Sequence, residues 1–390
     1  MGLYIHVPFC VHKCGYCDFN SWAETKREPQ LKWLEGLKAQ LNFWSPKLSA
    51  ARGKIDTVFF GGGTPSLLDS DILKEAVSVV FDAFDWAPDF EWTLEVNPET
   101  LSPQKLEDIQ GTVINRISMG VQSFNNEYLE RLERRARAED NRRALDLIAK
   151  SWGGRWSLDL MFALPGQTLV EWKADLEESM SFAPSHVSAY QLTLTTERSK
   201  NWKQAQDEKL LEMFEYTQSR LAESGLARYE VSNFARPDFE SRHNLRYWQV
   251  NPFLGLGPGA AGLIPSALFE TASGAGADYG AHQKNPDAFE TWLAGAGQEA
   301  VELRNLTRRS ARDHVFEKLM MGLRLKQGLD LQFLSGSSLQ SLTKESALVV
   351  DKGFARVEPE NLRILDSLLP GICSRIESEI NAETVKGFLK

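Results

Sequence analysis

Short apolar segments alternate with longer amphipathic segments along the first 225 residues, and this alternation limits the folds open to the chain. The segments typical of strands are residues 3–7, 57–60, 92–96, 116–120, 157–162 and 187–192. The segments typical of helices are residues 30–44, 70–84, 102–110, 140–150, 169–182 and 207–223. Strand–helix units at this spacing predict a parallel sheet covered by its crossover helices. Because such crossovers are right-handed, we expect an α/β fold that curls into a partial (β/α)6 barrel of the TIM type.

The alternation ends near Gly225, and we therefore predict three parts: residues 1–225 as the barrel domain, 226–304 as a connecting region and 305–390 as a smaller domain. The connecting region is rich in Gly, Pro and aromatic residues and has a small-residue loop at 274–280. In the last part, helical patterns cover 307–324, 331–334 and 339–352, and a hairpin pattern has its turn at 359–361. These patterns predict an α-rich, winged-helix-like domain.

Charge and hydropathy exclude some classes of function. The formal net charge of −9 argues against a general nucleic-acid binder, whose phosphate contacts need a basic surface. No window approaches the ~18 uninterrupted apolar residues of a membrane span. The first nine residues lack the basic and apolar regions of a secretory signal, so we expect a cytoplasmic protein. Peripheral membrane contact and the oligomeric state stay open.

Three of the four cysteines lie in one short loop. Cys10, Cys14 and Cys17 follow the first predicted strand with the spacing C-x3-C-x2-C, whereas Cys373 stands alone near the end of the chain. Thiolates are the usual ligands of iron–sulfur clusters. Three of them would hold three irons of a four-iron cluster and leave the fourth iron open to a substrate. A zinc site that uses His12 as its fourth ligand is the alternative, because structural zinc takes four protein ligands.

Further candidate binding residues lie on the other predicted strands, several at the carboxyl ends, where sites form in α/β folds. The second strand runs into Gly61-Gly62-Gly63-Thr64-Pro65, and glycines let backbone amides approach a ligand, although a plain tight turn has the same pattern. Glu95 ends the third strand and Asp159 lies in the fifth, each between apolar neighbours. A buried carboxylate needs a partner, which is either a ligand group or a salt bridge.

Two more polar residues follow the fourth predicted strand. Gln122 comes directly after it, and Arg134 lies further on, where its guanidinium would be able to bind a carboxylate through two hydrogen bonds. The alternative for Arg134 is a solvated helix face that it shares with Arg131, Arg135 and Arg137.

Together these segments resemble the radical S-adenosylmethionine (SAM) superfamily, in particular its coproporphyrinogen III dehydrogenase branch, over about residues 1–265. The resemblance implies that Cys10, Cys14 and Cys17 bind a [4Fe–4S] cluster whose open iron takes SAM. The reduced cluster would then cleave SAM to methionine and a 5′-deoxyadenosyl radical, a chemistry that belongs to the cofactor. The resemblance also implies that SAM is held by Tyr4, Tyr16, Gly62, Gly63, Thr64, Glu95, Gln122, Arg134 and Asp159.

Three features resemble the HemW heme chaperones of this branch rather than the dehydrogenase. Phe19 stands where the dehydrogenase has a fourth cysteine, and only three residues precede Tyr4, where the dehydrogenase has a long extension. Residues 242–248, R-H-N-L-R-Y-W, match the H-N-x-x-Y-W motif of HemW. The resemblance implies a protein that binds heme and passes it to acceptor proteins such as respiratory enzymes. His243 is the candidate heme-binding residue, with Arg242 and Arg246 near the propionates.

Several alternatives stay open at this stage. His243 also fits a role as a loop cap, with Tyr247 and Trp248 in the core. The chain also resembles a radical oxidoreductase acting on a porphyrinogen. A tRNA-modifying enzyme is disfavoured by the net charge of −9. Residues 192–199 lack the Glu-Pro-Gly-Thr that the family usually has after the sixth strand, which leaves the contacts of that loop open.

Overall fold

The computed structural model describes residues 1–390 except 52, 195–198, 200–201, 203–206, 270–278, 344–347, 358–364, 381–383 and 386–390. Most of the predicted small-residue loop and the predicted hairpin turn at 359–361 lie outside the described residues. None of the described helices combines the length and the apolar character that crossing a membrane requires.

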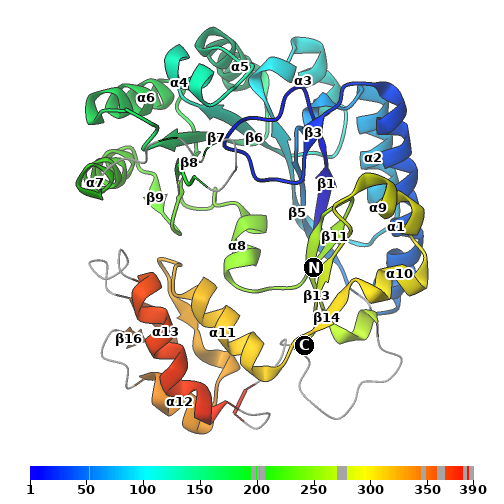
Figure 1. Cartoon of the computed structure of the whole chain (residues 1–390), viewed down its shortest axis with the longest axis vertical. Coiled ribbons are helices and arrows are strands. Elements are labelled where there is room, and N and C mark those ends of the chain that lie inside the picture. The colour runs from blue at the N-terminus through cyan, green and yellow to red at the C-terminus, as the bar shows by residue number, and fades with distance from the viewer. Residues whose placement is uncertain are drawn as a thin grey trace.

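Six parallel strands form the centre of the molecule, as the sequence predicts. They are neighbours in the order β1 (Gly2–Val7), β4 (Ile55–Gly62), β5 (Trp86–Val96), β6 (Arg116–Gln122), β7 (Arg155–Phe162) and β8 (His186–Gln191). The connecting helices are α1 (Arg27–Ala50), α2 (Ser70–Asp82), α3 (Pro103–Gln110), α5 (Ala138–Ser151), α6 (Leu169–Ser181) and α7 (Asp207–Glu223). Figure 1 shows these helices around the outside of the curved sheet. The predicted α/β fold with a parallel sheet is thus confirmed.

Alternation along the strands separates an apolar outer face from a more polar inner face. On β1, Leu3 and Ile5 are fully buried in the main core with Trp33 and Leu37 of α1. Tyr4 lies between them in the strand, so its side chain faces the opposite side, the inside of the barrel. The helices therefore hold the sheet from outside, and the inner face is left for polar groups.

The connecting region adds strands at both edges of this sheet, which the sequence analysis did not predict. On one side β11 (Phe253–Leu256) runs parallel to β1, and β12 (Ala261–Ile264), β13 (Ala281–Lys284) and β14 (Leu306–Arg308) continue antiparallel. On the other side β8 pairs with β10 (Asn233–Ala235), which pairs with β9 (Ala227–Arg228). These strands are only two to four residues long, too short to show a clear alternation.

The other described elements of this part are short. Helices α4 (Asn126–Arg131), α8 (Arg242–Trp248), α9 (Phe289–Gly295) and α10 (Glu299–Arg304) are joined by the two-stranded pair β2 (Phe9–Cys10) and β3 (Trp22–Ala23). The described 3-10 turns are η1 (Pro65–Leu67), η2 (Pro98–Thr100), η3 (Ser266–Leu268), η4 (Leu331–Phe333) and η6 (Glu377–Glu379). Figure 1 shows α8 between the sheet and the last helices of the chain.

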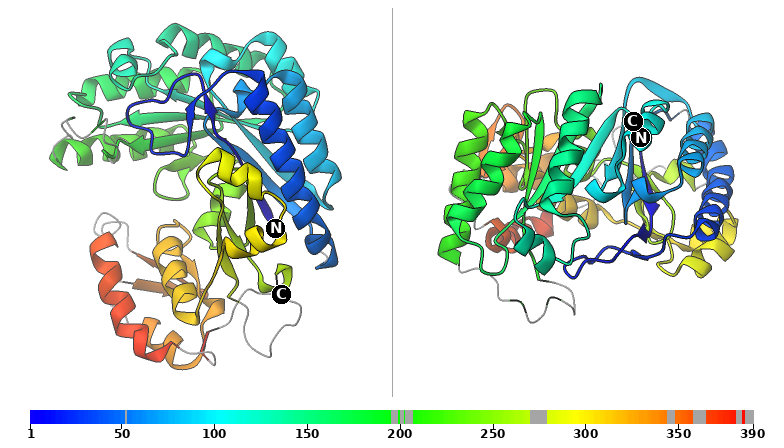
Figure 2. Two further views of the ribbon diagram at one scale, coloured as in Figure 1. Left: turned by 45° about the vertical axis from the view of Figure 1, so that its right-hand side comes forward. Right: turned by 90° about the horizontal axis from the view of Figure 1, so that it is seen from above.

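The last part of the chain has an apolar core of its own, which supports our proposal of a separate domain from about residue 305. It contains α11 (Ala311–Gly322), β15 (Leu329–Asp330), α12 (Gly336–Thr343), β16 (Leu348–Asp351), β17 (Phe354–Val357) and α13 (Leu365–Ile376). Figure 2 shows it as a compact unit beside the larger sheet. The proposed boundary near residue 225 stays a prediction.

One helix prediction in this part was too long, and another was partly wrong. The segment 307–324 divides into the end of β14 and helix α11, because Ser310 caps the helix through a capping box with Asp313. The segment 339–352 divides into α12 and strand β16, which pairs with β17 across the turn at Lys352 and Gly353. The β-branched Val349 and Val350 favour the strand.

A buried ion pair inside the barrel gives a test of the fold. Glu91 on β5 and Arg116 on β6 lie 3.4 Å apart, and their side chains are 3% and 2% exposed. The pair Glu130–Arg137 has the same 3.4 Å separation, but its side chains are 74% and 53% exposed. Glu91→Gln should lower the free energy of unfolding by about 3 kcal/mol, because it leaves a buried cation without its partner. Glu130→Gln should change it by less than about 0.5 kcal/mol in the same urea titration. Equal effects would contradict this burial.

Candidate cofactor site

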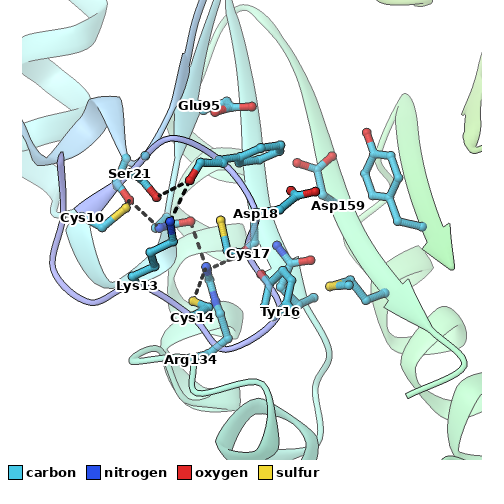
Figure 3. A pocket seen from close by; sticks show the side chains of 18 of the residues that line it. Cys10, Lys13, Cys14, Tyr16, Cys17, Asp18, Ser21, Glu95, Arg134 and Asp159 are labelled. Carbon is cyan, nitrogen blue, oxygen red and sulfur yellow. Dashed lines mark hydrogen bonds between the residues drawn. The ribbon is translucent and has the colours of Figure 1, made fainter. Parts of the chain in front are cut away.

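A cavity of about 440 Å³ lies at the carboxyl ends of the parallel strands (Figure 3). The cysteine loop forms one wall, and the ends of β4 to β8 form the rest. The cavity brings together most of the predicted site residues, namely Cys10, Cys14, Tyr16, Cys17, Gly62, Gly63, Thr64, Glu95, Gln122, Arg134 and Asp159. Tyr4 and His243 lie outside its lining.

The three cysteines are presented by a loop that is fixed at both ends. The Trp22 N–H donates to the Pro8 carbonyl at 3.0 Å, and the Glu24 N–H donates to the Cys10 carbonyl at 2.9 Å. Between these points the Cys17 N–H closes a turn on the Cys14 carbonyl at 3.2 Å. Figure 3 shows all three cysteines on the same side of the cavity.

Two donors from other elements reach the thiol groups. Thr64 Oγ1 lies 3.7 Å from the Sγ of Cys10, and Arg134 Nη1 lies 4.0 Å from the Sγ of Cys14. Burial raises the pKa of the Cys10 and Cys17 thiols. The thiolates that bind metal therefore need stabilisation from the metal or from such donors.

His12 contacts a carboxylate, which leaves the zinc alternative open, because metal-bound imidazoles also pair with carboxylates. Its Nε2 lies 3.2 Å from Glu133 Oε2, so a carboxylate from the segment after α4 already holds the imidazole. Among the described residues, no group of three His, Cys, Asp or Glu side chains is arranged around a single ion.

The glycine triplet lies against the cysteine loop. The Gly63 N–H donates to the Val7 carbonyl and the Thr64 N–H to the Phe9 carbonyl, both at 2.7 Å. A Cβ at Gly63 would lie 2.6 Å from the Phe9 carbonyl oxygen and 3.0 Å from Cys10 Sγ. Gly62 has a φ of +113°. The glycines thus have a structural reason to be here, and contact with a ligand stays a prediction.

The two carboxylates predicted to need partners both face this cavity. Glu95 Oε2 accepts a hydrogen bond from the Gly62 N–H at 3.0 Å, and Asp159 Oδ2 accepts one from Ser118 Oγ at 3.1 Å. Neither forms a salt bridge within the described part of the chain. Burial raises the pKa of Glu95 to about 8, with a further contribution from the charge of Asp159. Burial likewise raises the pKa of Asp159 to about 6. Both carboxylates are therefore placed to accept hydrogen bonds from a ligand.

Arg134 points into the cavity rather than into solvent. Its Nη2 donates to Asn97 Oδ1 at 3.0 Å and to the Gly120 carbonyl at 2.8 Å, while its buried Nε has no partner among the described residues. Glu133, which precedes it, has a φ of +58° and turns the chain inward after α4. The unpaired Nε leaves one donor for a ligand.

Some lining residues were not predicted from the sequence. Asn97, Ser118, Met161 and Tyr190 also face the cavity. Asn97 follows Glu95 by two residues, so the period of two along a strand would have found it. Gln122, which was predicted, has a φ of +69° next to an irregularity in the β6–β7 pairing. This local change of direction brings its side chain to the cavity.

Tyr4 lies behind the cavity wall. Its hydroxyl pairs with His6 Nδ1 at 2.9 Å, and His6 Nε2 pairs with the carbonyl of Asn20 at 2.7 Å. Tyr4 therefore connects, through His6, to the end of the cysteine loop. Its predicted contact with SAM is not part of the described cavity lining.

His243 lies on α8 and is fully buried. Its Nδ1 pairs with Thr57 Oγ1 at 3.0 Å, its Nε2 pairs with the Tyr247 hydroxyl at 2.8 Å, and its ring stacks on Phe59. His243 is thus a core residue, whereas the alternative gave it as a loop cap and placed only Tyr247 and Trp248 in the core. Its role as a heme ligand stays a prediction.

Arg246, on the same helix, is also hydrogen-bonded within the protein. Its Nη2 donates to both carboxylate oxygens of Asp56, at 2.5 and 2.6 Å, and its Nη1 donates to the Pro252 carbonyl at 2.9 Å. A bound propionate would have to compete with Asp56 for this guanidinium.

Comparisons with known proteins agree with this geometry. A family model for the radical SAM superfamily matches residues 4–178, and one for the HemN C-terminal domain matches residues 310–364. Heme chaperone HemW of Haemophilus influenzae is 37% identical over 271 residues, which are 68% of this chain and 70% of the relative. HemW of Escherichia coli is 38% identical over 268 residues, with the same coverage. The chain belongs to the HemW family.

Other relatives extend the match. The mitochondrial radical S-adenosyl methionine domain-containing protein 1 of Danio rerio is 33% identical over 412 residues, covering 99% of this chain and 89% of that protein. The structure of coproporphyrinogen III oxidase (HemN) from Escherichia coli, a radical SAM enzyme, superposes with a TM-score of 0.77 at 20% identity. The superposition covers 97% of this chain and 90% of HemN, and it supports the fold of this HemW relative.

Membership of the radical SAM superfamily implies a [4Fe–4S] cluster and SAM, and the cavity fits both. Three thiols on one wall match the cysteine ligands of such a cluster. The buried Nε of Arg134, a lining residue, lacks a hydrogen-bond partner within the described residues. Such atoms are satisfied when a polar ligand binds next to them.

The raised pKa of Glu95 gives a pH test. In the folded protein without cofactors Glu95 holds its proton up to about pH 8, whereas the unfolded chain releases it near 4.5. The neutral form therefore contributes stability that is fully present below pH 4.5 and is lost as the pH rises to 8. Glu95→Gln should flatten the decrease in unfolding free energy between pH 5 and 8.5, measured by urea titration. The exposed control Glu107→Gln should leave the slope unchanged. An identical slope in Glu95→Gln would contradict the burial of this carboxyl.

Proposed function

We propose that this protein is a heme chaperone that binds heme, carries a [4Fe–4S] cluster, binds SAM and passes heme to acceptor proteins such as respiratory enzymes. Identity of 37–38% with proteins named heme chaperone HemW, over 68% of the chain, carries the proposal. Phe19 supports it, because this 57% exposed side chain lines the cavity where the dehydrogenase branch has a further cysteine. The proposal includes a cytoplasmic location.

In this proposal the cluster is held by Cys10, Cys14 and Cys17, and when bound it supplies an electron to SAM. Thr64 and Arg134 donate to two of the thiolates and stabilise their charge. The residues proposed to hold SAM are Tyr4, Tyr16, Gly62, Gly63, Thr64, Glu95, Gln122, Arg134 and Asp159.

The carboxylates, the glycines and the guanidinium have different tasks in holding SAM. Glu95 and Asp159 accept hydrogen bonds from its hydroxyl or ammonium groups, which compensates for their burial. The glycines let the backbone come close to the ligand. Arg134, through its free Nε, binds a carboxylate.

Heme binding rests on the family and on the motif around α8. If His243 were an axial ligand, its Nδ1 or Nε2 would first have to leave Thr57 or Tyr247. That exchange takes a hydrogen-bond partner from a buried hydroxyl, which costs about 1–3 kcal/mol if the hydroxyl is left unpaired. Heme ligation at His243 therefore requires a rearrangement of α8.

Substitution of the cysteines tests the cluster. Replacing Cys10, Cys14 or Cys17 by Ser should abolish the visible absorption of the anaerobically reconstituted protein, because each change removes one iron ligand. Cys373→Ser is the matched control, since Cys373 lies on α13 in the other apolar core. Full retention of the cluster in all three loop variants would refute the assignment.

An activity assay separates the chaperone from a porphyrinogen oxidoreductase. Reconstituted protein, dithionite and SAM are incubated without oxygen with coproporphyrinogen III, and products are resolved by chromatography. We expect no protoporphyrinogen, while the same sample retains added heme on gel filtration. Formation of protoporphyrinogen at an enzymatic rate would overturn the chaperone proposal in favour of oxidative decarboxylation.

A further inference from the structure

A second cavity, of about 880 Å³, lies at the opposite ends of the barrel strands. Its walls come from the first half of β5, from the start of β7 with the two glycines before it, and from the segment that leads into α8. Clefts that hold drug-sized ligands have volumes of ~300–1,000 Å³, so this cavity is large enough for a ligand at the upper end of that range. The cysteine cavity is half as large and is needed for the cluster and SAM.

Two guanidinium groups line the cavity and keep free donors. The Arg155 guanidinium lies over the Phe239 ring at 5.3 Å and 4.0 Å from Glu91, and within the described residues it donates no hydrogen bond. Arg242 uses one nitrogen, Nη1, for Asp89. The side chains of Arg155 and Arg242 are 42% and 34% exposed. Both can therefore donate further hydrogen bonds to an anionic group.

The carboxylates of the cavity limit how much negative charge a ligand can carry. Glu91 is already paired with Arg116 and accepts the His243 N–H at 3.2 Å, and Asp89 is paired with Arg242. Asp238 and Glu240 also line the cavity. A polyphosphate would be repelled by these groups. A ligand with one or two carboxylates on an otherwise apolar frame fits better.

The apolar part of the lining suits a flat ligand. The apolar lining residues are Pro88, Phe90, Phe239 and Leu245, although the Phe90 ring also packs on Phe81 and Trp86. Gly153 leaves open space, because a Cβ placed there meets nothing within 4 Å. Aromatic faces pack well against a planar conjugated ring system.

We propose that this cavity binds a flat macrocycle that carries carboxylates, a porphyrin dicarboxylate such as heme. Arg155 and Arg242 bind the carboxylates, and Phe239 packs on the ring. The naming of heme as the occupant rests on the proposed function. The cavity shares α8 with the H-N-x-x-Y-W motif, since Arg242 and Leu245 line it and Glu91 joins it to the backbone of His243. The motif thus shapes the wall of the cavity without His243 having to bind the iron.

Filling the open space tests this site. Gly153→Trp places a large side chain where no atom stands, and Gly153→Ala is the matched control with the same backbone change. Hemin is titrated anaerobically into the reconstituted full-length protein and followed by its absorption, and metal-free protoporphyrin is titrated in parallel by fluorescence. Gly153→Trp should weaken both ligands at least tenfold, and Gly153→Ala should bind like the unmodified protein. The visible absorption of the cluster reports that each variant is folded.

Removing a guanidinium tests the carboxylate contacts. Arg155→Gln should weaken hemin and protoporphyrin about tenfold, the effect of one lost charge-assisted hydrogen bond. Arg27→Gln is the matched control, because Arg27 carries the same charge on α1 and pairs with Asp69 and Asp71. Hemin affinities that are unchanged in both Gly153→Trp and Arg155→Gln would overturn this site and leave the heme chaperone intact. Failure of the unmodified protein to bind hemin would overturn the proposed function itself.

Discussion

The parallel pairing of β1 with β4 is the contact on which the cofactor site depends. Its register sets Val7 opposite Gly62, so both strands end at the same level. The cysteine loop that follows β1 therefore lies directly on the glycine triplet that follows β4, and the Gly63 and Thr64 amides bind its carbonyls. A side chain at Gly63 would push the two loops apart. The position of Cys10 is thus fixed by backbone contacts before any cluster binds.

Polarity inside the barrel follows from the same sheet. Helices cover the outer face, so the apolar residues of each strand point outward and the alternate residues meet inside. At one end these inner residues are Glu95 and Asp159, which lack counter-ions within the described residues and keep raised pKa values. At the other end they are Glu91 and Arg116, which form an ion pair under α8. One end thus has carboxylates without counter-ions among the described residues, whereas at the other end Glu91 is paired with Arg116.

Much of this arrangement follows from the sequence. The six long strands were predicted because their apolar segments alternate with amphipathic segments. The positions of Glu95 and Asp159 on such strands then predicted buried carboxylates that need a partner. The short strands β9 to β14 were missed, since segments of two to four residues carry no measurable period. Helix α4 is six residues long, and the chain turns inward after it to place Arg134 at the cavity. The H-N-x-x-Y-W motif does not predict the burial of His243. That burial depends on Thr57, which lies 186 residues away in the sequence and pairs with His243 Nδ1.

The interior between the two ends is packed. The Tyr4 ring stacks on Phe59 at 6.4 Å, and Phe59 stacks on His243 at 5.6 Å, so side chains fill the path from the cysteine loop to α8. A heme bound beside α8 would be separated from the cluster by these rings. The cluster and SAM would then not contact the macrocycle. Thr57 and Asp56, at the start of β4, bind His243 and Arg246 of α8.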